Sequence, residues 1–299
     1  MRRFAEGCPI LLGAIVKSMR PRQWTKNFFV FAGLLFTLDQ RHSPIDFARV
    51  TAAFALFCVL SGSVYLLNDI LDAERDRKHP TKSKRPNASG GLAVGSAWAA
   101  AFVLLAGALL GSFSLSIGFG TAAAAYVVLQ IAYSFALKHV VILDVMIIAT
   151  GFVLRAIAGA VVIRVVISPW LLMCTILLAL FLALAKRRAE LVRLEENAGS
   201  HRVSLERYSV PFLDQLMAIT TASTVISYSL YTFFSDTGKA HPYMMATLPF
   251  VIYGIFRYLL LIHENAGADS PEMLVIADKP LLLDILLWAI ACALIVKLD

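Results

Sequence analysis

Residues 47–71, FARVTAAFALFCVLSGSVYLLNDIL, form an apolar run that becomes acidic only at its end. A helix needs roughly 20 mostly apolar residues to cross the hydrocarbon core of a bilayer. Arg49 stands near the start of the run, and the next charged residue is Asp69. The run therefore predicts a transmembrane helix that leaves the membrane in the polar segment around Asp69.

Runs of the same kind recur along the chain and dominate its composition. Of the 299 residues, 59% are hydrophobic and 16% are charged, which is too apolar for a water-soluble domain of this length. We expect an all-α membrane protein, a bundle of about nine transmembrane helices. It would form a single polytopic membrane domain over residues 1–299, with cytoplasmic caps near 72–91, 137–143 and 187–210. The predicted spans are 24–40, 47–71, 92–112, 114–136, 141–163, 169–186, 211–235, 242–263 and 280–297.

The charged connectors predict the orientation. With the N-terminus in the cytoplasm, most of the 27 Lys and Arg residues fall in connectors on that side, as the positive-inside rule requires. We expect a multi-pass protein of the inner (plasma) membrane with its N-terminus and polar site cytoplasmic and its C-terminus outside. Arg2 and Arg3 are not followed by a compact apolar run ending in small residues, so no cleavable signal peptide is expected. The net charge of +7 belongs to membrane-flanking loops, and no nucleic acid partner is expected.

The segment Asn68-Asp69-Ile70-Leu71-Asp72-Ala73-Glu74-Arg75-Asp76 is the first candidate for chemistry. On one helix, Asp69, Asp72 and Asp76 share a face at i, i+3 and i+7, and Asn68 adds a carbonyl oxygen near Asp72. Like charges at this spacing repel each other unless a cation binds between them. Mg²⁺ is commonly bound by one or two carboxylates together with substrate phosphates. We therefore expect a magnesium–diphosphate site that uses Asn68 and the three aspartates. The alternative is a solvated helix end whose acids pair with Arg75, Arg77 and Lys78.

Cations flank this acidic segment in the sequence. The segment His79-Pro80-Thr81-Lys82-Ser83-Lys84-Arg85-Pro86 follows it. Metal-bound diphosphate needs cations on its remaining oxygens, so Lys82 and Arg85 are candidate phosphate ligands. Residues 19–27 combine cations with Trp24, a pattern that a positive-inside membrane anchor would also explain. The candidate substrate-binding residues in this N-terminal stretch are Arg20, Arg22, Gln23, Lys26 and Asn27.

Two further polar clusters follow the fourth and sixth predicted spans. The first contains Tyr133 and Lys138, then Asp144 and Arg155, all four of them candidate substrate-binding residues. Asp144 and Arg155 share a helix face but lie roughly 16 Å apart along it, so each needs another partner. Ionisable groups in apolar surroundings are costly and indicate function by default. The second cluster could equally be a surface helix with salt bridges, and it contains Lys186, Arg187 and Glu190.

Signatures of soluble enzymes are missing from the sequence. It contains no GxxxxGK[ST], GxGxxG, HExxH or GxSxG motif. What it offers is acids for a metal ion and cations for phosphates, gathered at one face of a lipid-accessible bundle. This combination indicates metal-assisted departure of diphosphate.

The motif Asn68-Asp69-x-x-Asp72-x-x-x-Asp76, followed by His79-Pro80-x-Lys82-x-x-Arg85-Pro86, resembles the first signature of the UbiA superfamily of intramembrane prenyltransferases. That family has nine transmembrane helices and uses Mg²⁺. Four further stretches resemble its decaprenyl-phosphate phosphoribosyltransferase branch: residues 20–27, 133–138, 151–159 and 186–191. Where most members carry a second acidic motif, this chain has Lys186-Arg187-Arg188-Ala189-Glu190, and the branch usually has an aromatic residue in place of Arg188.

The resemblance implies a reaction and a role for each site residue. Phosphoribosyl diphosphate and a polyprenyl phosphate lipid would give polyprenyl-phosphoryl-5-phosphoribose and diphosphate. The implied metal-holding and catalytic residues are Asp69, Asp72 and Asp76, with Lys138 and Glu190 completing the catalytic set. Lys82, Arg85 and Lys138 would bind the donor's phosphates. The 5-phosphate and the lipid phosphate would be shared among Arg20, Arg22, Lys26, Lys186 and Arg187, and Glu190 would bind a ribose hydroxyl or a metal-bound water.

Two rival functions remain open at this point. One is an ordinary prenyltransferase that moves an isoprenoid from its diphosphate to an aromatic or other acceptor. The other is a transporter for phosphorylated solutes, in which intramembrane charges would mark the pathway. The crowding of charges at one membrane face and the lack of a symmetric pair of broken helices argue against transport. Lipid chain length and a homo-oligomeric state are also left open by the sequence.

Overall fold

A computed structural model describes the chain except for residues 1–10, 78–81, 197–206, 265–273, 276 and 299. In this described part every regular element is a helix, and there is no β-strand. Parts of two predicted caps and the residues His79 and Pro80 lie outside it. The long helices are α3 (Pro44–Leu71), α5 (Val94–Leu115), α6 (Ile117–Phe135), α7 (Leu143–Val162), α8 (Pro169–Glu196), α9 (Val210–Phe234), α11 (Leu248–Glu264) and α13 (Lys279–Leu298).

Short helices occupy the N-terminal segment and the connectors. Those that concern the site are η1 (Pro21–Phe31), α2 (Ala32–Leu35), α4 (Ala73–Arg77), η2 (Lys82–Lys84) and η3 (Leu137–His139). At the opposite ends of the long helices lie α10 (Asp236–Ala240) and η5 (Pro242–Thr247).

Seven helices in the described residues are long and apolar enough to span a membrane. They are α3, α5, α6, α7, α8 up to Val192, the η5–α11 pair, and α13. The predicted span 211–235 coincides with α9, which has 25 residues but is rich in Ser and Thr. Several of these hydroxyls donate to backbone carbonyls one turn earlier, as Thr221 and Thr224 do, so they are satisfied within the helix. The chain is a multi-pass membrane protein, as predicted.

The first predicted span, residues 24–40, is not a continuous α-helix. Residues 21–31 form the 3₁₀ helix η1, and α2 ends at Leu35. A 3₁₀ helix rises about 2.0 Å per residue, so the eleven residues of η1 cover roughly 22 Å, more depth than an α-helix of equal length. The N-terminal segment therefore reaches far along the bundle with few residues.

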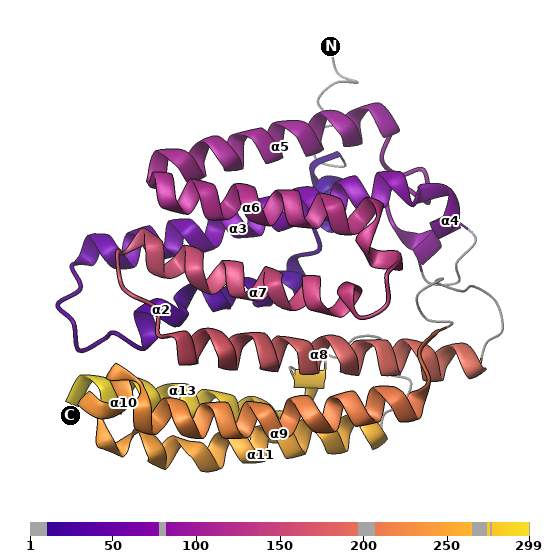
Figure 1. The fold of residues 1–299 in the computed structure, drawn as a ribbon. Helices are drawn as coiled ribbons and strands as arrows, with labels where there is room; N and C mark the ends of the chain where they lie inside the picture. Colours follow the sequence, from indigo (N-terminus) through magenta and orange to yellow (C-terminus); the bar gives the residue numbers. More distant parts are fainter. Residues whose placement is uncertain (1–10, 78–81, 197–206, 265–273, 276, 299) are drawn as a thin grey trace.

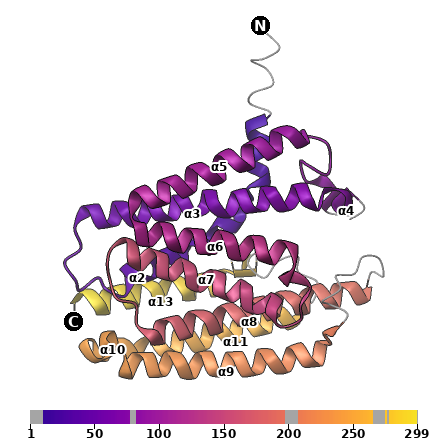
Figure 2. The same ribbon diagram turned by 45° about the horizontal axis from the view of Figure 1, so that its top comes forward.

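The long helices lie nearly side by side in the order α5, α3 with α6, α7, α8, and then the group α9, α11 and α13 (Figure 1). The closest neighbours include α3 with α5, α7 with α8, and α8 with α9. Figure 2 shows the same layers after rotation, with α4 at one end of the bundle and α10 at the other. The two halves of the chain thus meet along α7 and α8.

The start of α3 follows directly from its sequence. Ser43 and Asp46 form a capping box: the Ser43 amide donates to Asp46 Oδ2 at 2.9 Å, and Pro44 occupies the first helical position. From there the helix runs uninterrupted to Leu71 and delivers Asp69 to the far end of the bundle. The capping box at the start of α3 thereby helps to set where the acidic segment begins at the opposite end of the helix.

Gly159 in α7 allows a very close approach between two elements of the fold. A Cβ atom at this position would overlap the carbonyl oxygen of Val30 in η1. Val30 is fully buried, and Ala158 next to Gly159 belongs to the same apolar cluster. The backbone of η1 therefore lies directly against the backbone of α7.

We expect Gly159→Ala to destabilise the protein by about 2–3 kcal/mol, because the backbones must separate to admit the methyl group. Gly107→Ala in α5 is the matched control, since a Cβ there meets nothing within 4 Å and alanine favours helix by about 1 kcal/mol. Thermal unfolding of both variants in detergent measures the difference. Equal midpoints for the two variants would contradict the close contact.

Candidate active site

The acidic segment lies where α3 ends and α4 begins. The backbone amide of Asp72 donates to the carbonyl of Asn68 at 2.9 Å, and that of Asp76 donates to Asp72 at 2.8 Å, so the helical path continues across the junction. Asp69 and Asp76 are 2% and 4% exposed, whereas the Asp72 side chain is 34% exposed. The predicted spacing is kept, but two of the three carboxylates are turned into the protein.

Arg85 joins the two buried carboxylates. Its Nη1 atom lies 3.1 Å from Asp69 Oδ1 and 2.6 Å from Asp76 Oδ2. Arg85 follows η2 and therefore comes from the basic segment that the sequence places next to the acids. Two carboxylate oxygens thus approach one cationic centre from different helices, the end of α3 and α4.

Arg20 and Lys138 bring cations from two other parts of the chain. Arg20 Nη2 forms an ion pair with Asp69 Oδ1, and its guanidinium lies 4.8 Å from the centre of the Tyr65 ring. Lys138 in η3 places Nζ 3.6 Å from Asp72 Oδ1. The acids therefore pair with Arg20, Arg85 and Lys138. The alternative interpretation, a solvated helix end, required pairing with the local Arg75 and Arg77 instead. Its third cation, Lys78, lies outside the described residues.

The donor set at this cluster suits a hard divalent cation. Carboxylate and amide oxygens are the protein ligands that Mg²⁺ takes, usually one or two of them completed by phosphate and water. Asp69 and Asp76 already converge on a single positive centre at Arg85. Among the described residues no three His, Cys, Asp or Glu side chains form a ready-made metal site. The residues present therefore fit a cation that is held jointly with a phosphorylated ligand.

A second cluster is centred on the buried Arg187 in α8. Its Nε donates to Asp144 Oδ2 at 2.7 Å, Nη1 donates to Glu190 at 2.6 Å, and Nη2 donates to the Tyr133 hydroxyl at 3.0 Å. Arg187 is 1% exposed and Asp144 is 0% exposed. All three guanidinium nitrogens of Arg187 bind within the protein in this structure, and its expected phosphate contact stays a prediction. Asp144 has its partner on another helix, as its distance from Arg155 requires.

A third cluster ties Asn27 to Arg155 in the interior of the bundle. Arg155 Nε donates to Asn27 Oδ1 at 2.8 Å, Nη2 to the Tyr126 hydroxyl at 2.9 Å and Nη1 to the Gly151 carbonyl at 2.8 Å. Both side chains are buried, and the guanidinium also lies over the Tyr126 ring. In this structure these two predicted substrate-binding residues therefore contact each other and hold η1 against α6 and α7.

The other predicted site residues lie nearer the surface. Arg22 and Lys82 are exposed, and Asn68, Gln23, Lys26, Lys186 and Glu190 are partly exposed. Gln23, Lys26, Lys82, Lys186 and Glu190 each take part in further interactions. Arg188, the departure from the family pattern, donates to Asp214 of α9 at 2.6 Å. The additional positive charge of Arg188 on α8 is therefore paired with the carboxylate of Asp214 on α9.

Sequence reasoning did not identify Tyr208, whose side chain is 5% exposed. Its hydroxyl donates to Asp144 at 2.9 Å and accepts from the amide of Ile142 at 2.8 Å. Tyr208 belongs to no motif, and 64 residues separate it from Asp144. The sequence signals only that Asp144, an acidic residue in an apolar span, needs a partner. It does not indicate that this partner is Tyr208.

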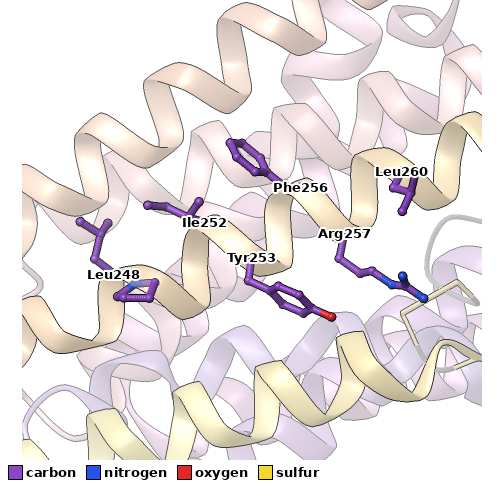
Figure 3. Close-up of a pocket in the computed structure, with 7 residues that line it drawn as sticks. Leu248, Ile252, Tyr253, Phe256, Arg257 and Leu260 are labelled. Atoms are coloured by element: carbon purple, nitrogen blue, oxygen red, sulfur yellow. The ribbon is translucent and has the colours of Figure 1, made fainter.

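Figure 3 shows a groove along α11 that involves none of the predicted site residues. Its lining is apolar except for Tyr253 and Arg257, and Arg257 makes two hydrogen bonds to Asp278 at 2.8 and 3.2 Å. These bonds lower the pKa of Asp278 below its usual value. A groove whose charged lining residue is already paired lacks the groups that a reaction on phosphates needs.

The chain is similar to known proteins along most of its length. The model of the UbiA prenyltransferase family matches residues 27–277. The decaprenyl-phosphate phosphoribosyltransferase of Mycolicibacterium smegmatis is 35% identical over 293 residues, covering 93% of this chain and 91% of that protein. The enzyme of the same name from Mycobacterium tuberculosis is 33% identical over 281 residues, covering 93% and 92%.

The fold has relatives among solved structures. The structure of a UbiA homolog from Archaeoglobus fulgidus bound to DMAPP and Mg²⁺ matches with a TM-score of 0.69, over 94% of this chain and 98% of that one, at 17% identity. A likeness at this identity concerns the fold alone. Because the family model covers most of the chain and full-length relatives exceed 30% identity, the chain belongs to the UbiA prenyltransferase family.

Proposed function

We propose that this protein transfers the 5-phosphoribosyl group of 5-phosphoribosyl 1-diphosphate to a polyprenyl phosphate, with release of diphosphate. The observation that carries the proposal is the similarity, over 93% of the chain, to decaprenyl-phosphate phosphoribosyltransferases. The cluster of three acids with Arg20, Arg85 and Lys138 supports it, since both substrates are phosphates. A product of this kind would be a precursor in the synthesis of an arabinose donor for the cell envelope.

The acid cluster would hold Mg²⁺ through Asp69, Asp72 and Asp76, with Asn68 beside them. Bound there, the ion would supply positive charge to the departing diphosphate. Arg85 is placed to add to that charge: among the described contacts only its Nη1 is used by the carboxylates, which leaves the remaining N–H groups for phosphate oxygens. Lys138 and Lys82 are the further candidates for the donor's phosphates.

The remaining surface-near cations are candidates for the 5-phosphate and the lipid phosphate. They are Arg20, Arg22, Lys26 and Lys186, with Gln23, Tyr133 and Glu190 able to bind hydroxyl or phosphate oxygens. The lipid phosphate oxygen would form a bond to C1 of the ribose as the bond from C1 to the diphosphate breaks. An anionic nucleophile needs no general base, so the contribution of the protein is positioning and charge.

We place the site on the cytoplasmic face of the inner membrane. The positive charges of the connectors near α4, η3 and the end of α8 support this orientation through the positive-inside rule. The sugar donor is a soluble cytoplasmic metabolite, which would reach the site from that side. The end of α13 would then lie outside.

The test is the formation of a labelled lipid. Purified protein in detergent is incubated with Mg²⁺, labelled 5-phosphoribosyl 1-diphosphate and a polyprenyl phosphate; we expect label in the lipid fraction and loss of activity on chelation of divalent cations. A parallel reaction offers a polyprenyl diphosphate with an aromatic acceptor. A prenylated acceptor without any ribosylated lipid would overturn the proposal in favour of ordinary prenyl transfer.

A further inference from the structure

The connector between α6 and α7 contains a residue in an unfavourable backbone conformation. Ile142, immediately before α7, has φ 71° and ψ −47°. A β-branched residue at positive φ is a genuine outlier, and such a conformation persists only where its surroundings hold it. Ile142 is also 47% exposed, so its own side chain is only partly packed.

The hydroxyl of Tyr208 contacts this residue directly. The amide of Ile142 donates to it at 2.8 Å, and the hydroxyl donates in turn to Asp144 Oδ1 at 2.9 Å. Asp144 is fixed on its other oxygen by Arg187. Burial, together with the bond to Asp144, raises the pKa of Tyr208 to about 12, so the hydroxyl keeps the proton that it donates.

The same connector carries Lys138, which pairs with Asp72. Lys138 lies in η3, and the Val140 amide that follows donates to the Leu137 carbonyl at 3.2 Å. The Asp144 amide donates to the Val140 carbonyl at 3.0 Å. A continuous set of backbone bonds therefore links η3 to the first turn of α7, where Tyr208 acts. Any relaxation of Ile142 would turn η3 relative to α7.

We infer that Tyr208 is a positioning residue of the transferase: by holding Ile142 in its positive-φ conformation it sets the place of Lys138 beside Asp72. Tyr208 itself lies at the start of α9, directly before the Ser209 cap of that helix. The contact thus makes the position of a cation in the first half of the chain depend on a residue from the second half. This inference rests on the proposed function for its kinetic consequence, but its structural consequence can be measured separately.

The first measurement is kinetic. Tyr208→Phe removes the hydroxyl and keeps the ring that stacks on Phe212. We expect kcat/KM for the phosphoribosyl donor to fall about tenfold, the factor that corresponds to one hydrogen bond linked to a charged group. The loss should be in the KM for the donor, with the KM for the lipid acceptor unchanged, because Lys138 is assigned to the donor's phosphates.

The second measurement does not depend on turnover. In hydrogen–deuterium exchange of the intact protein, Tyr208→Phe should speed exchange in the peptide covering residues 136–146. Peptides of α11 and α13 should stay unchanged. Tyr228→Phe is the matched control, because it also removes a buried, hydrogen-bonded hydroxyl. That hydroxyl lies near the other end of α9, where it bonds to Thr247 and Trp288.

Rescue separates positioning from general stability. Glycine adopts positive φ without strain, whereas alanine does not. We therefore expect Ile142→Gly to restore donor kcat/KM in the Tyr208→Phe background and Ile142→Ala to fail.

Unchanged exchange in the connector, or a donor KM equal to that of the wild type, would overturn the inference. A wild-type protein that forms no ribosylated lipid would instead overturn the proposed function, and the exchange data would still decide whether Tyr208 holds the connector.

Discussion

Replacing Asp69 by asparagine is expected to lower ribosyl transfer by a factor on the order of 10³, with the helical fold retained. Asp69 is buried between Arg20 and Arg85, and asparagine has nearly its shape but not its charge. Arg20 would then lose its carboxylate partner, Arg85 would keep Asp76, and a metal ion brought with the donor would lose an anionic ligand. Asp72→Asn should act similarly, because it removes the carboxylate paired with Lys138. Initial rates of labelled-lipid formation at saturating substrates measure both effects.

Glu74→Gln is the matched control for this series. Glu74 lies in α4 between Asp72 and Asp76, but its side chain is exposed. We expect a rate close to that of the wild type. An equal loss in Glu74→Gln would show that the total charge of the segment matters and the individual positions do not. Near-normal activity of Asp69→Asn, at an unchanged unfolding midpoint, would remove Asp69 from the site.

Replacing Arg187 by methionine is expected to destabilise the protein by about 3–5 kcal/mol, the usual effect of leaving one charge of a buried pair without its partner. Asp144 is fully buried and would keep only the Tyr208 hydroxyl as a donor from a side chain. Glu190 and Tyr133 would each lose a bond as well. Thermal or denaturant unfolding in detergent measures the change in the free energy of unfolding.

The double variant Arg187→Met/Asp144→Asn tests the cause. If the unpaired carboxylate is what destabilises Arg187→Met, removing its charge should recover a large part of the loss. Arg257→Met is a control in a partly exposed pair with Asp278, where solvent screens the charges and a much smaller effect is expected. A double variant no more stable than Arg187→Met alone would show that packing, and not the buried charge, dominates.

The helices that the sequence predicted best are those with uniform apolar runs. The boundaries of α3, α6, α7 and α13 follow the predicted spans within a few residues, because hydropathy over a bilayer-length window is a property of each segment alone. The N-terminal span differed because its conformation depends on the rest of the fold. Asn27 of η1 donates to Ser61 of α3 and accepts from Arg155 of α7, contacts that a local pattern does not contain.

The same distinction applies to the site. The spacing of Asp69, Asp72 and Asp76 and the basic segment with Arg85 are local, and the structure brings Asp69 and Asp76 together at Arg85. The partners of Asp144 are not local: Arg187 is 43 residues away and Tyr208 is 64 away. Hydropathy predicted that a charge at Asp144 needs a partner, but many cations in the chain could have supplied it. Only tertiary packing of α7 against α8 selects Arg187.

The contact between the Val30 carbonyl and Gly159 has a mechanical consequence. The Val30 carbonyl occupies the space that a Cβ atom would take at Gly159, so a shift of η1 along α7 would press it against neighbouring residues that have a Cβ atom, and steric repulsion resists such a shift. Arg20 stands at the head of η1 and Asp144 in the first turn of α7. The spacing between these two charged residues is therefore set by steric exclusion, and it should survive high ionic strength, under which ion pairs near the surface weaken.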